Sequence, residues 1–262
     1  MIHRMPTVFV SHGAPSLLLE QGPAYAFLQS LGGLLPRPKS VVCVSAHWDT
    51  ARPALTGHPA PDTVHDFYGF PAPLYDVRYA CPGDAPLAAA LRARLTESGL
   101  QADVHATRGL DHGAWVPLAL MYPAADIPVI QLSVQSGDDA GHHLKLGHAL
   151  QPLRDEGVLI LASGGATHNL REAGRYALDT PPPAYASEFD AWLYQSIQTA
   201  DEAALLDYTQ AAPHAARNHP TAEHLLPLFV ALGAGGAGVK GRRLHHGYTY
   251  GILSMAAYAW GL

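Results

Sequence analysis

The stretch that decides the fold is Ser40-Val41-Val42-Cys43-Val44-Ser45-Ala46-His47-Trp48, an apolar run that ends in a histidine. Three more runs of this kind occur at Thr7–Val10, Val129–Val134 and Val158–Ser163. Short, near-continuous apolar segments are typical of strands in a sheet that is covered on both faces. We therefore expect these four runs to be buried strands.

Helical patterns lie between and after these strands. Leucines spaced by three or four residues and a following glycine predict helices over Pro86–Glu97 and His142–Asp155. Alternation of strand and helix predicts an α/β sheet with helices on both faces. Further along, we expect a helix that begins at Ser187, two more over Asp201–Gln210 and Thr221–Leu232, and a returning strand within Tyr248–Met255. The last helix would have Thr221 as its N-cap and Gly233 as its terminator.

The composition narrows the class of protein. Of the 262 residues, 15% are charged and 48% hydrophobic, which excludes a disordered chain. The net charge is −6 and there is no run of lysine or arginine, so we expect no nucleic-acid partner. Met1–Pro6 lacks the apolar stretch of a signal peptide, and the most apolar window, Leu225–Val239, is interrupted by proline and glycine. We therefore expect a cytoplasmic protein without a membrane partner.

Histidine is unusually frequent, with 16 copies against 16 lysines and arginines together. His12 and His47 each follow an apolar strand, and His168 lies just past the end of a third. In open α/β sheets, ligands bind beyond the carboxyl ends of the strands. Each histidine alone could simply cap a loop, but three of them together favour a shared pocket that holds a metal ion.

Other histidines lie in four settings. His112 occupies a glycine-bounded turn before an apolar helix, and His219 occupies a loop. Glu223 and His224 are adjacent in an expected helix, about 100° apart around its axis, so we expect one of them to face a metal. The pairs at 142–143 and 245–246 have polar surroundings and are expected at the surface.

Several other catalytic templates are excluded. Gly233–Gly238 has glycines spaced as in a dinucleotide-binding loop, but it follows a helix, whereas that motif needs a preceding strand. The sequence contains no phosphate-binding loop, HExxH helix or nucleophile elbow. What remains is one metal ion held by imidazoles, with spare histidines as proton carriers. Such a site suits Fe(II) oxygen chemistry, and Zn(II) would use the same ligands.

Six motifs in order resemble one family. They are Ser11–Pro15, Ser45–Trp48, His65–Pro71, Leu110–Trp115, His168–Arg171 and Glu223–Leu228. Together they resemble the class III extradiol ring-cleavage dioxygenases, and within them the 4,5-DOPA extradiol dioxygenase branch, over about residues 6–258. The resemblance implies a single-domain α/β/α sandwich with a mixed, largely parallel central sheet, which we expect to span residues 1–262.

The resemblance also implies the ligand set. His12 and His47 match metal ligands. The third ligand is a glutamate in the wider class, whereas the DOPA branch has a histidine at the position of His224, so we expect His224 rather than Glu223. His168 matches a catalytic base in the wider class and a fourth ligand in the DOPA branch. The implied cofactor is Fe(II), with Zn(II) able to occupy the same site in purified protein.

The implied reaction inserts both atoms of O2 into a DOPA-like catechol and gives a ring-opened semialdehyde. We expect His112 and His168 to be catalytic, and His65, Asp66 and Tyr68 to contact the substrate. Tyr68 and Phe70 would stack on its ring, and Asp66 and Arg171 would meet its amino-acid end. Two alternatives are a zinc-dependent hydrolase in the same pocket and a non-catalytic metal-binding interaction protein. The sequence makes no prediction about the oligomeric state.

Overall fold

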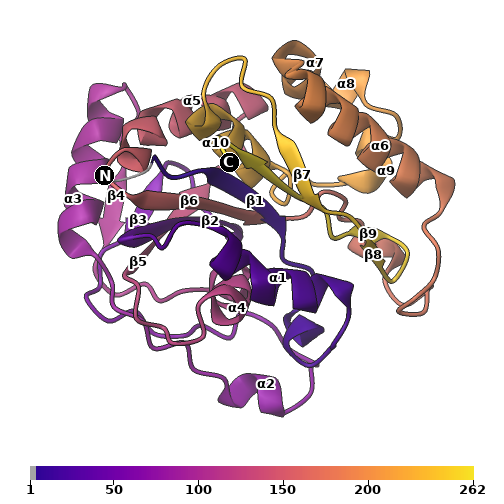
Figure 1. Cartoon of the computed structure of the whole chain (residues 1–262), viewed down its shortest axis with the longest axis horizontal. Coiled ribbons are helices and arrows are strands. Elements are labelled where there is room, and N and C mark those ends of the chain that lie inside the picture. Colours follow the sequence, from indigo (N-terminus) through magenta and orange to yellow (C-terminus); the bar gives the residue numbers. More distant parts are fainter. Residues whose placement is uncertain (1–3) are drawn as a thin grey trace.

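A computed structural model describes residues 4–262, so the first three residues of Met1–Pro6 lie outside the described part (Figure 1). The core is an eight-stranded sheet in the order β4-β3-β5-β2-β6-β1-β10-β7. Its strands are β1 (Thr7–Ser11), β2 (Ser40–Asp49), β3 (Ala54–Thr56), β4 (Asp103–His105), β5 (Val129–Val134), β6 (Val158–Gly164), β7 (Arg242–His245) and β10 (Ala257–Trp260). A separate hairpin pairs β8 (Tyr248–Thr249) with β9 (Leu253–Ser254).

The four predicted strands form the parallel centre of this sheet. β2 pairs in parallel with β5 and β6, and β6 pairs in parallel with β1. β10 runs antiparallel to both β1 and β7, and β3 runs antiparallel to β5. The sheet is therefore mixed and largely parallel, as predicted. The carboxyl ends of β1, β2 and β6 lie side by side.

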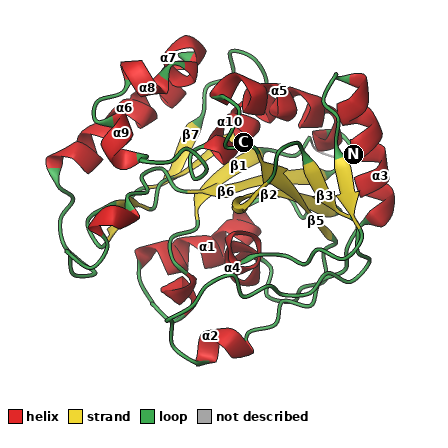
Figure 2. Cartoon of the chain, turned by 180° about the vertical axis from the view of Figure 1, so that it is seen from behind, coloured by secondary structure: helices red, strands yellow, loops and turns green. Residues whose placement is uncertain are grey.

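Helices cover both faces of the sheet, which confirms the predicted α/β/α sandwich (Figures 1 and 2). α1 (Pro23–Leu34) and α4 (His112–Met121) pack on one face, against Val8, Val10 and other buried strand residues. α3 (Ala85–Glu97), α5 (Ala140–Leu150) and α10 (Leu226–Gly235) pack on the other face, against Phe9 and its neighbours. Successive side chains in a strand point to opposite faces, so continuous apolar strands supply both cores.

Shorter elements complete the chain. The remaining helices are α2 (Pro73–Asp76), α6 (Ala184–Thr199), α7 (Glu202–Leu206), α8 (Tyr208–Ala211) and α9 (Ala215–Asn218), with 3₁₀ turns η1 (Pro15–Leu18), η2 (Gln151–Arg154) and η3 (Leu170–Glu172). The expected helix over Asp201–Gln210 is thus two short helices that meet at Asp207. The expected strand within Tyr248–Met255 is the hairpin of β8 and β9. After this hairpin, the chain returns to the main sheet as β10.

The helix predicted over Thr221–Leu232 is displaced. α10 begins at Leu226, with Pro227 in its first turn, where the missing proline N–H costs no hydrogen bond. Thr221 is not its N-cap, because its hydroxyl donates to Glu223 Oε1 at 2.8 Å. Gly233 does not end the helix but lies inside it, where a Cβ would come within 2.2 Å of the Leu144 carbonyl oxygen of α5. Glycine at this position therefore permits close packing of α5 and α10.

Two histidines expected at the surface or in a loop are buried instead. Nε2 of His143 accepts from the backbone N–H of Gln135 at 3.1 Å, and its Nδ1 lies 2.9 Å from the Asp139 carbonyl oxygen. Burial lowers the pKa of His143 to about 4. His219 is buried as well, with Nε2 3.0 Å from the Ala166 carbonyl oxygen. Both rings are thus held by backbone groups and have structural roles.

Within residues 4–262, no helix combines the length and the apolar character that a membrane crossing requires.

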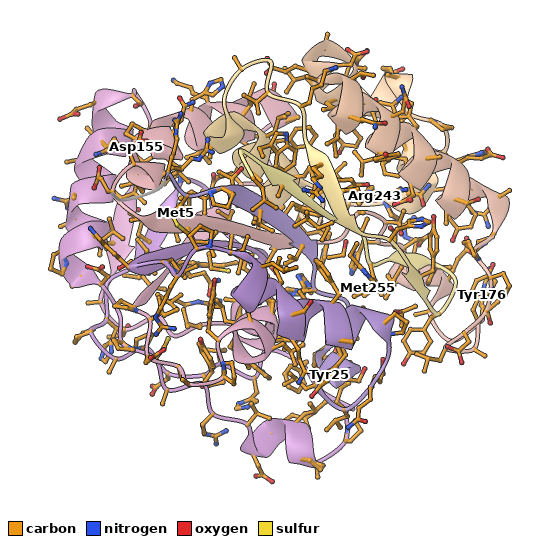
Figure 3. All side chains as sticks on the ribbon, in the orientation of Figure 1. Met5, Tyr25, Asp155, Tyr176, Arg243 and Met255 are labelled. Atoms are coloured by element: carbon orange, nitrogen blue, oxygen red, sulfur yellow. The ribbon has the colours of Figure 1, made fainter. Side chains whose placement is uncertain are left out.

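A buried arginine joins the ends of several elements at the edge of the molecule away from the strand carboxyl ends. Figure 3 places Met5 and Asp155 at one end of the sheet and Met255 at the other. Next to Asp155, the Arg154 guanidinium donates to the carbonyl oxygens of Met5 (2.6 Å), Ala234 (2.9 Å) and Gly235 (2.8 Å). It therefore links β1, η2 and α10.

We predict that Arg154→Ala lowers the free energy of unfolding by about 3 kcal/mol, because three buried carbonyl groups lose a charged donor. Urea denaturation followed by circular dichroism measures this loss. Arg4→Ala is the matched control, since Arg4 forms only an exposed contact with Asp155 at 3.4 Å and is expected to change stability by less than about 1 kcal/mol. Equal losses in the two variants would contradict the prediction.

Candidate metal centre

Three strand ends and one turn bring the histidines together. His12 directly follows β1, and His47 lies near the end of β2, where the pairing of β2 with β5 shifts in register. His224 lies in the turn before α10, and its carbonyl oxygen accepts from the Gly165 N–H at 2.8 Å, just past β6. A Cβ on Gly164 would come within 2.1 Å of that carbonyl oxygen. Glycine at 164 is therefore required for His224 to reach the strand ends.

The three rings point their Nε2 atoms at one another. His47 Nε2 lies 3.0 Å from His12 Nε2 and 3.2 Å from His224 Nε2. All three nitrogens lie within 4.8 Å of each other, close enough to bind one metal ion together. A facial set of imidazoles with open positions is a common way to hold Fe(II) or Zn(II).

Hydrogen bonding fixes the orientation of His12. Ser163 Oγ donates its only proton to the Gly113 carbonyl oxygen, so it must accept from His12 Nδ1, which lies 2.9 Å away. With Nδ1 protonated, the neutral His12 ring presents an Nε2 lone pair toward His47 and His224. Metal-binding histidines characteristically donate their other N–H in this way, so the donor set fits a metal ion.

Carboxylates face the outer nitrogens of the other two rings. His224 Nδ1 lies 3.2 Å from Glu223 Oε1, and His47 Nδ1 lies 3.7 Å from Asp66 Oδ2. Glu223 therefore contacts the outer edge of His224, while His224 Nε2 joins His12 and His47. This geometry supports His224 as the third ligand, with Glu223 orienting its ring.

The three rings are neutral at ordinary pH. Burial, followed by the other histidines nearby, keeps the pKa values of His12 and His224 well below their usual range. Burial and the proximity of His112 lower the pKa of His47 to about 3. Because a metal ion competes with protons for the imidazole lone pair, such a site is ready to bind without first releasing protons.

His168 lies beside this group. Its ring stacks on that of His224, with centroids 3.4 Å apart and planes at 8°. Its backbone N–H donates to the Asn218 carbonyl oxygen at 3.0 Å, which anchors the segment after β6. Burial lowers the pKa of His168 to about 4. The structure thus brings His168 to the site, in a position compatible with either predicted role.

His112 is the first residue of α4 rather than part of a preceding turn. Its ring centroid lies 3.8 Å from that of His47, and its Nδ1 lies 2.9 Å from Asp66 Oδ1. Asp66 also accepts from the His112 backbone N–H at 2.9 Å. Burial would raise the pKa of Asp66, but these contacts with His112 lower it to about 2. Asp66 therefore bridges His47 and His112 as a carboxylate.

Asp111, which our reading of the sequence missed, supports this arrangement. It is fully buried, caps α4 by accepting from the Ala114 N–H at 3.3 Å, and accepts from Ser45 Oγ at 2.6 Å. Gln131 of β5 donates to its other oxygen. Asp111 thereby connects β2, β5 and α4 directly behind His47 and His112. An aspartate before an apolar helix is an N-cap signal, so the sequence did contain a clue.

A cavity of about 260 Å³ opens onto these rings. It is lined by Gly13, Ala14, Pro15, His47, Phe67, Tyr68, Phe70, His112, His168, Leu170, His224 and Leu253. Its walls are mainly apolar and aromatic, and its imidazoles are its chief polar groups. Tyr68 is 91% exposed at the rim. The cavity is small, and its volume suits a ligand with a single aromatic ring.

Three residues expected to contact substrate are not in the cavity lining, namely His65, Asp66 and Arg171. Asp66 instead lies against His47 and His112. The His65 ring packs against Phe67 and Trp115, and its Nε2 lies 3.1 Å from the Val77 carbonyl oxygen, so it supports the aromatic wall from behind. Arg171 is exposed on η3 and does not line the cavity either. Of the predicted substrate contacts, Tyr68 and Phe70 do line it.

Comparison with known proteins identifies the family. Residues 6–260 match the family described as the catalytic LigB subunit of aromatic ring-opening dioxygenase. The chain belongs to this family. It is 42% identical over 261 residues to the 4,5-DOPA dioxygenase extradiol of Beta vulgaris, covering 96% of this chain and 95% of that protein. It is 40% identical to the protein of the same name in Escherichia coli K12, covering 88% and 85% of the two chains.

A solved structure agrees with the fold. The crystal structure of an uncharacterized Escherichia coli K12 protein superposes with a TM-score of 0.83 at 33% identity, over 98% of this chain and all of that one. The family predicted from the six motifs is confirmed, and so is the predicted enzyme class, an extradiol dioxygenase. The comparisons favour this class over a hydrolase or a non-catalytic protein.

We predict that His12→Ala and His47→Ala each reduce bound metal from about one ion per chain to below about 0.1, because two imidazoles do not retain a divalent ion through dialysis. Elemental analysis after anaerobic Fe(II) loading and, separately, after Zn(II) loading measures this. His148→Ala, an exposed histidine on α5, is the control and should retain the ion. Full metal content in the His12→Ala/His47→Ala double variant would contradict the ligand assignment.

Proposed function

We propose that this LigB-family protein is an extradiol dioxygenase that inserts both atoms of O2 into the ring of a DOPA-like catechol and releases a ring-opened semialdehyde. The observation that carries the proposal is the convergence of three imidazole Nε2 atoms at the inner end of a single-ring cavity. Relatives named 4,5-DOPA dioxygenase extradiol support the choice of substrate. The expected reactants are the catechol and O2, in the cytoplasm, with no nucleic-acid or membrane partner.

We propose mononuclear non-haem Fe(II) as the metal, held by His12, His47 and His224, with Zn(II) able to bind the same ligands. When bound, Fe(II) supplies a Lewis acid that lowers the pKa of the catechol hydroxyls and a redox centre through which O2 can react. A metal ion held by these residues would adjoin the substrate cavity, because two of the three rings line it. The cavity lies on the side of His47 and His224.

The cavity walls orient the ring. Phe67 and Phe70 form one aromatic wall, with ring centroids 5.4 Å apart, and Leu253 closes the cavity from the hairpin. Apolar contacts on both faces would hold a flat ring with its hydroxyl edge toward the histidines. Holding the reactants in a fixed orientation is worth several kcal/mol of activation free energy, about 7 or more in favourable cases. Tyr68 at the rim is placed to contact the substituent that projects outward.

Two histidines in the wall provide proton transfer. A neutral His168 can take a proton from a catechol hydroxyl, a step typically worth about 10²–10⁴ in rate. His112 Nδ1 lies 2.9 Å from Asp66 Oδ1, so the ring is held beside His47 in the cavity wall. From this position His112 can return a proton as the ring opens. His168 can alternatively act as a fourth ligand, as in the DOPA branch.

Anaerobic loading with Fe(II), followed by addition of a catechol panel and then air, tests the proposed function. We expect stoichiometric oxygen uptake and a new visible absorption band of a semialdehyde with L-DOPA, and neither with an isosteric monophenol such as tyrosine. The zinc-loaded protein should show neither signal. Turnover of an ester or amide by the zinc form under nitrogen, without oxygen uptake by the iron form, would overturn the proposal.

Substitution of His112 and His168 distinguishes a metal ligand from a proton carrier. We predict that His112→Ala keeps full metal content but loses about 10²–10⁴ in kcat, because proton transfer is lost and the ligands stay. If His168 is the base, His168→Ala behaves in the same way, and if it is a fourth ligand, metal affinity falls too. Equilibrium metal titration and oxygen-electrode kinetics on the same samples measure both. Wild-type kcat in His112→Ala would contradict its role.

A further inference from the structure

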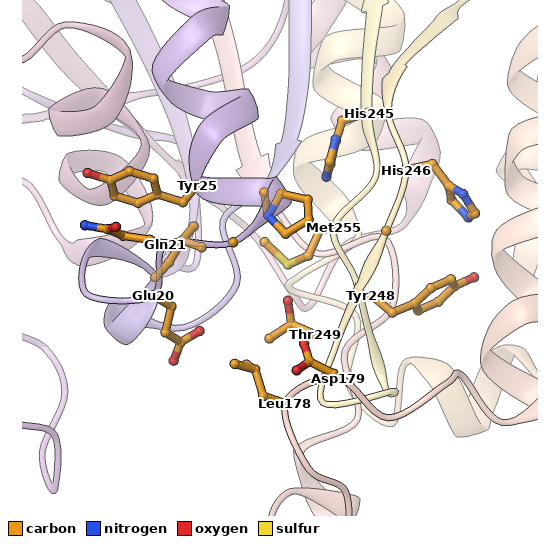
Figure 4. A pocket seen from close by; sticks show the side chains of 15 residues that line it. Glu20, Gln21, Tyr25, Leu178, Asp179, His245, His246, Tyr248, Thr249 and Met255 are labelled. Carbon is orange, nitrogen blue, oxygen red and sulfur yellow. The ribbon is translucent and has the colours of Figure 1, made fainter.

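Two further hollows lie near the candidate metal site, in addition to the substrate cavity. The outer one, with a volume of about 450 Å³, is lined by Leu17, Glu20–Tyr25, Leu178, Asp179, His245–Thr249 and Met255 (Figure 4). The inner one, about 10 Å³, has room for roughly one water-sized molecule. The inner void is lined by Ser11, His12, Gly13, Gly164, Gly165, Thr167, His168, His224, Leu253, Ser254 and Met255.

Shared walls connect these hollows in a row. Met255 lines both the outer hollow and the inner void. The inner void shares Gly13, His168, His224 and Leu253 with the substrate cavity. Figure 4 shows Met255 between the segment that carries Gln21 and Tyr25 and the strands that carry His245 and Thr249. One side chain thus separates the outer hollow from a void that touches two of the proposed metal ligands.

The position and flexibility of the Met255 side chain suit a movable wall between the two hollows. Met255 is 3% exposed, and its backbone N–H donates to the Gly247 carbonyl oxygen at 2.8 Å, so its main chain is fixed. An ideal Cβ on Gly13 would lie 2.9 Å from the Met255 methyl carbon, so the thioether packs directly against the Gly13 backbone next to His12. An unbranched thioether has three rotatable bonds and adapts to its surroundings. Its tip can move while the backbone stays in place.

The inner void offers no free hydroxyl group to water. Ser11 Oγ donates to the Ala256 carbonyl oxygen at 2.9 Å and accepts from the Ala166 N–H at 3.0 Å. Thr167 Oγ1 donates to the Ile252 carbonyl oxygen at 2.8 Å and accepts from the Ser254 N–H at 2.6 Å.

The third hydroxyl in this lining is also engaged, because Ser254 Oγ donates to Asp190 Oδ1 at 2.6 Å. A buried water normally makes about three hydrogen bonds to groups that lack other partners. The serine and threonine hydroxyls therefore already have partners, and the remaining polar side chains of the lining are the imidazoles of the candidate metal site and His168. The void is large enough for a diatomic molecule such as O2 as well as for one water.

We propose that the inner void is a transit site for dioxygen and that Met255 is its gate, so that O2 reaches the candidate metal site from the outer hollow while the catechol occupies the substrate cavity. This inference rests on the proposed function, because only an enzyme that consumes O2 needs such a route. A catechol is far larger than the void, whereas O2 is close to water in size. The two reactants then reach the histidines through different hollows, since the outer hollow and the substrate cavity share no lining residue.

Paramagnetic relaxation by dissolved O2 tests the route without catalysis. The protein contains four methionines, of which Met5, Met121 and Met255 are buried to a similar degree, at 2%, 4% and 3% exposure. In zinc-loaded protein with ¹³C-labelled methionine methyls, we expect O2 pressure to enhance the relaxation of the Met255 methyl at least about threefold more than that of Met5 or Met121. Met5→Leu and Met121→Leu assign the signals. Equal enhancement at the three methyls would overturn the proposal.

Steady-state kinetics of Met255 variants provide an independent test of the gate. In the iron enzyme, we expect Met255→Phe to lower kcat/KM for O2 about tenfold, with a much smaller change in anaerobic catechol affinity, and Met255→Ala to leave kcat/KM for O2 undiminished or raise it. Equal losses in both variants, or no change in either, would overturn the gate. If the wild-type iron protein consumes no O2 with any catechol, the proposed function fails, whereas the relaxation experiment still decides whether O2 reaches the Met255 methyl group beside Gly13.

Discussion

The close approach of the turn at residues 221–225 to the end of β6 is the constraint on which the site depends. His224 reaches His12 and His47 because its carbonyl oxygen bonds the N–H of Gly165 and lies where a Cβ on Gly164 would be. The sheet brings His12 and His47 to one edge through the parallel pairing of β1 and β2 with β6. The third imidazole comes from far along the chain, and only a glycine at the strand end admits it.

Around this contact, the ligating atoms are oriented from outside. Ser163, Glu223 and Asp66 face the Nδ1 atoms of the three rings, so each ring turns Nε2 inward. Asp66 also contacts His112, which ties a proposed proton carrier to a proposed ligand. Asp111 then fixes the start of α4 behind them. The three imidazoles are thus oriented by contacts from outside, while Tyr68 lies at the rim of the substrate cavity and Met255 lines the inner void.

Much of this arrangement could be predicted from the sequence, and the failures have physical causes. Apolar strands that end in histidine predicted the parallel centre and the grouping of His12 and His47, because strand polarity alone decides where carboxyl ends meet. The predicted start of α10 was wrong because Thr221 has the residue type of an N-cap. In the structure, its hydroxyl instead donates to Glu223. His143 looked like a surface residue beside His142, yet backbone groups of Gln135 and Asp139 supply its hydrogen bonds. These partners are near in sequence, but the bonds depend on how the turn before α5 folds back on the helix, which the pattern of residue types does not reveal.

The order of the strands also bears on how the polypeptide matures during synthesis. β1 lies between β6, about 150 residues later, and β10, about 250 residues later. The first strand to leave the ribosome must therefore wait for two of the last segments before both of its edges are paired. Sheets dominated by such distant pairings form slowly and expose unpaired edges meanwhile. Until β10 is synthesised, one edge of β1 stays unpaired, and such an edge can pair with a strand of another chain.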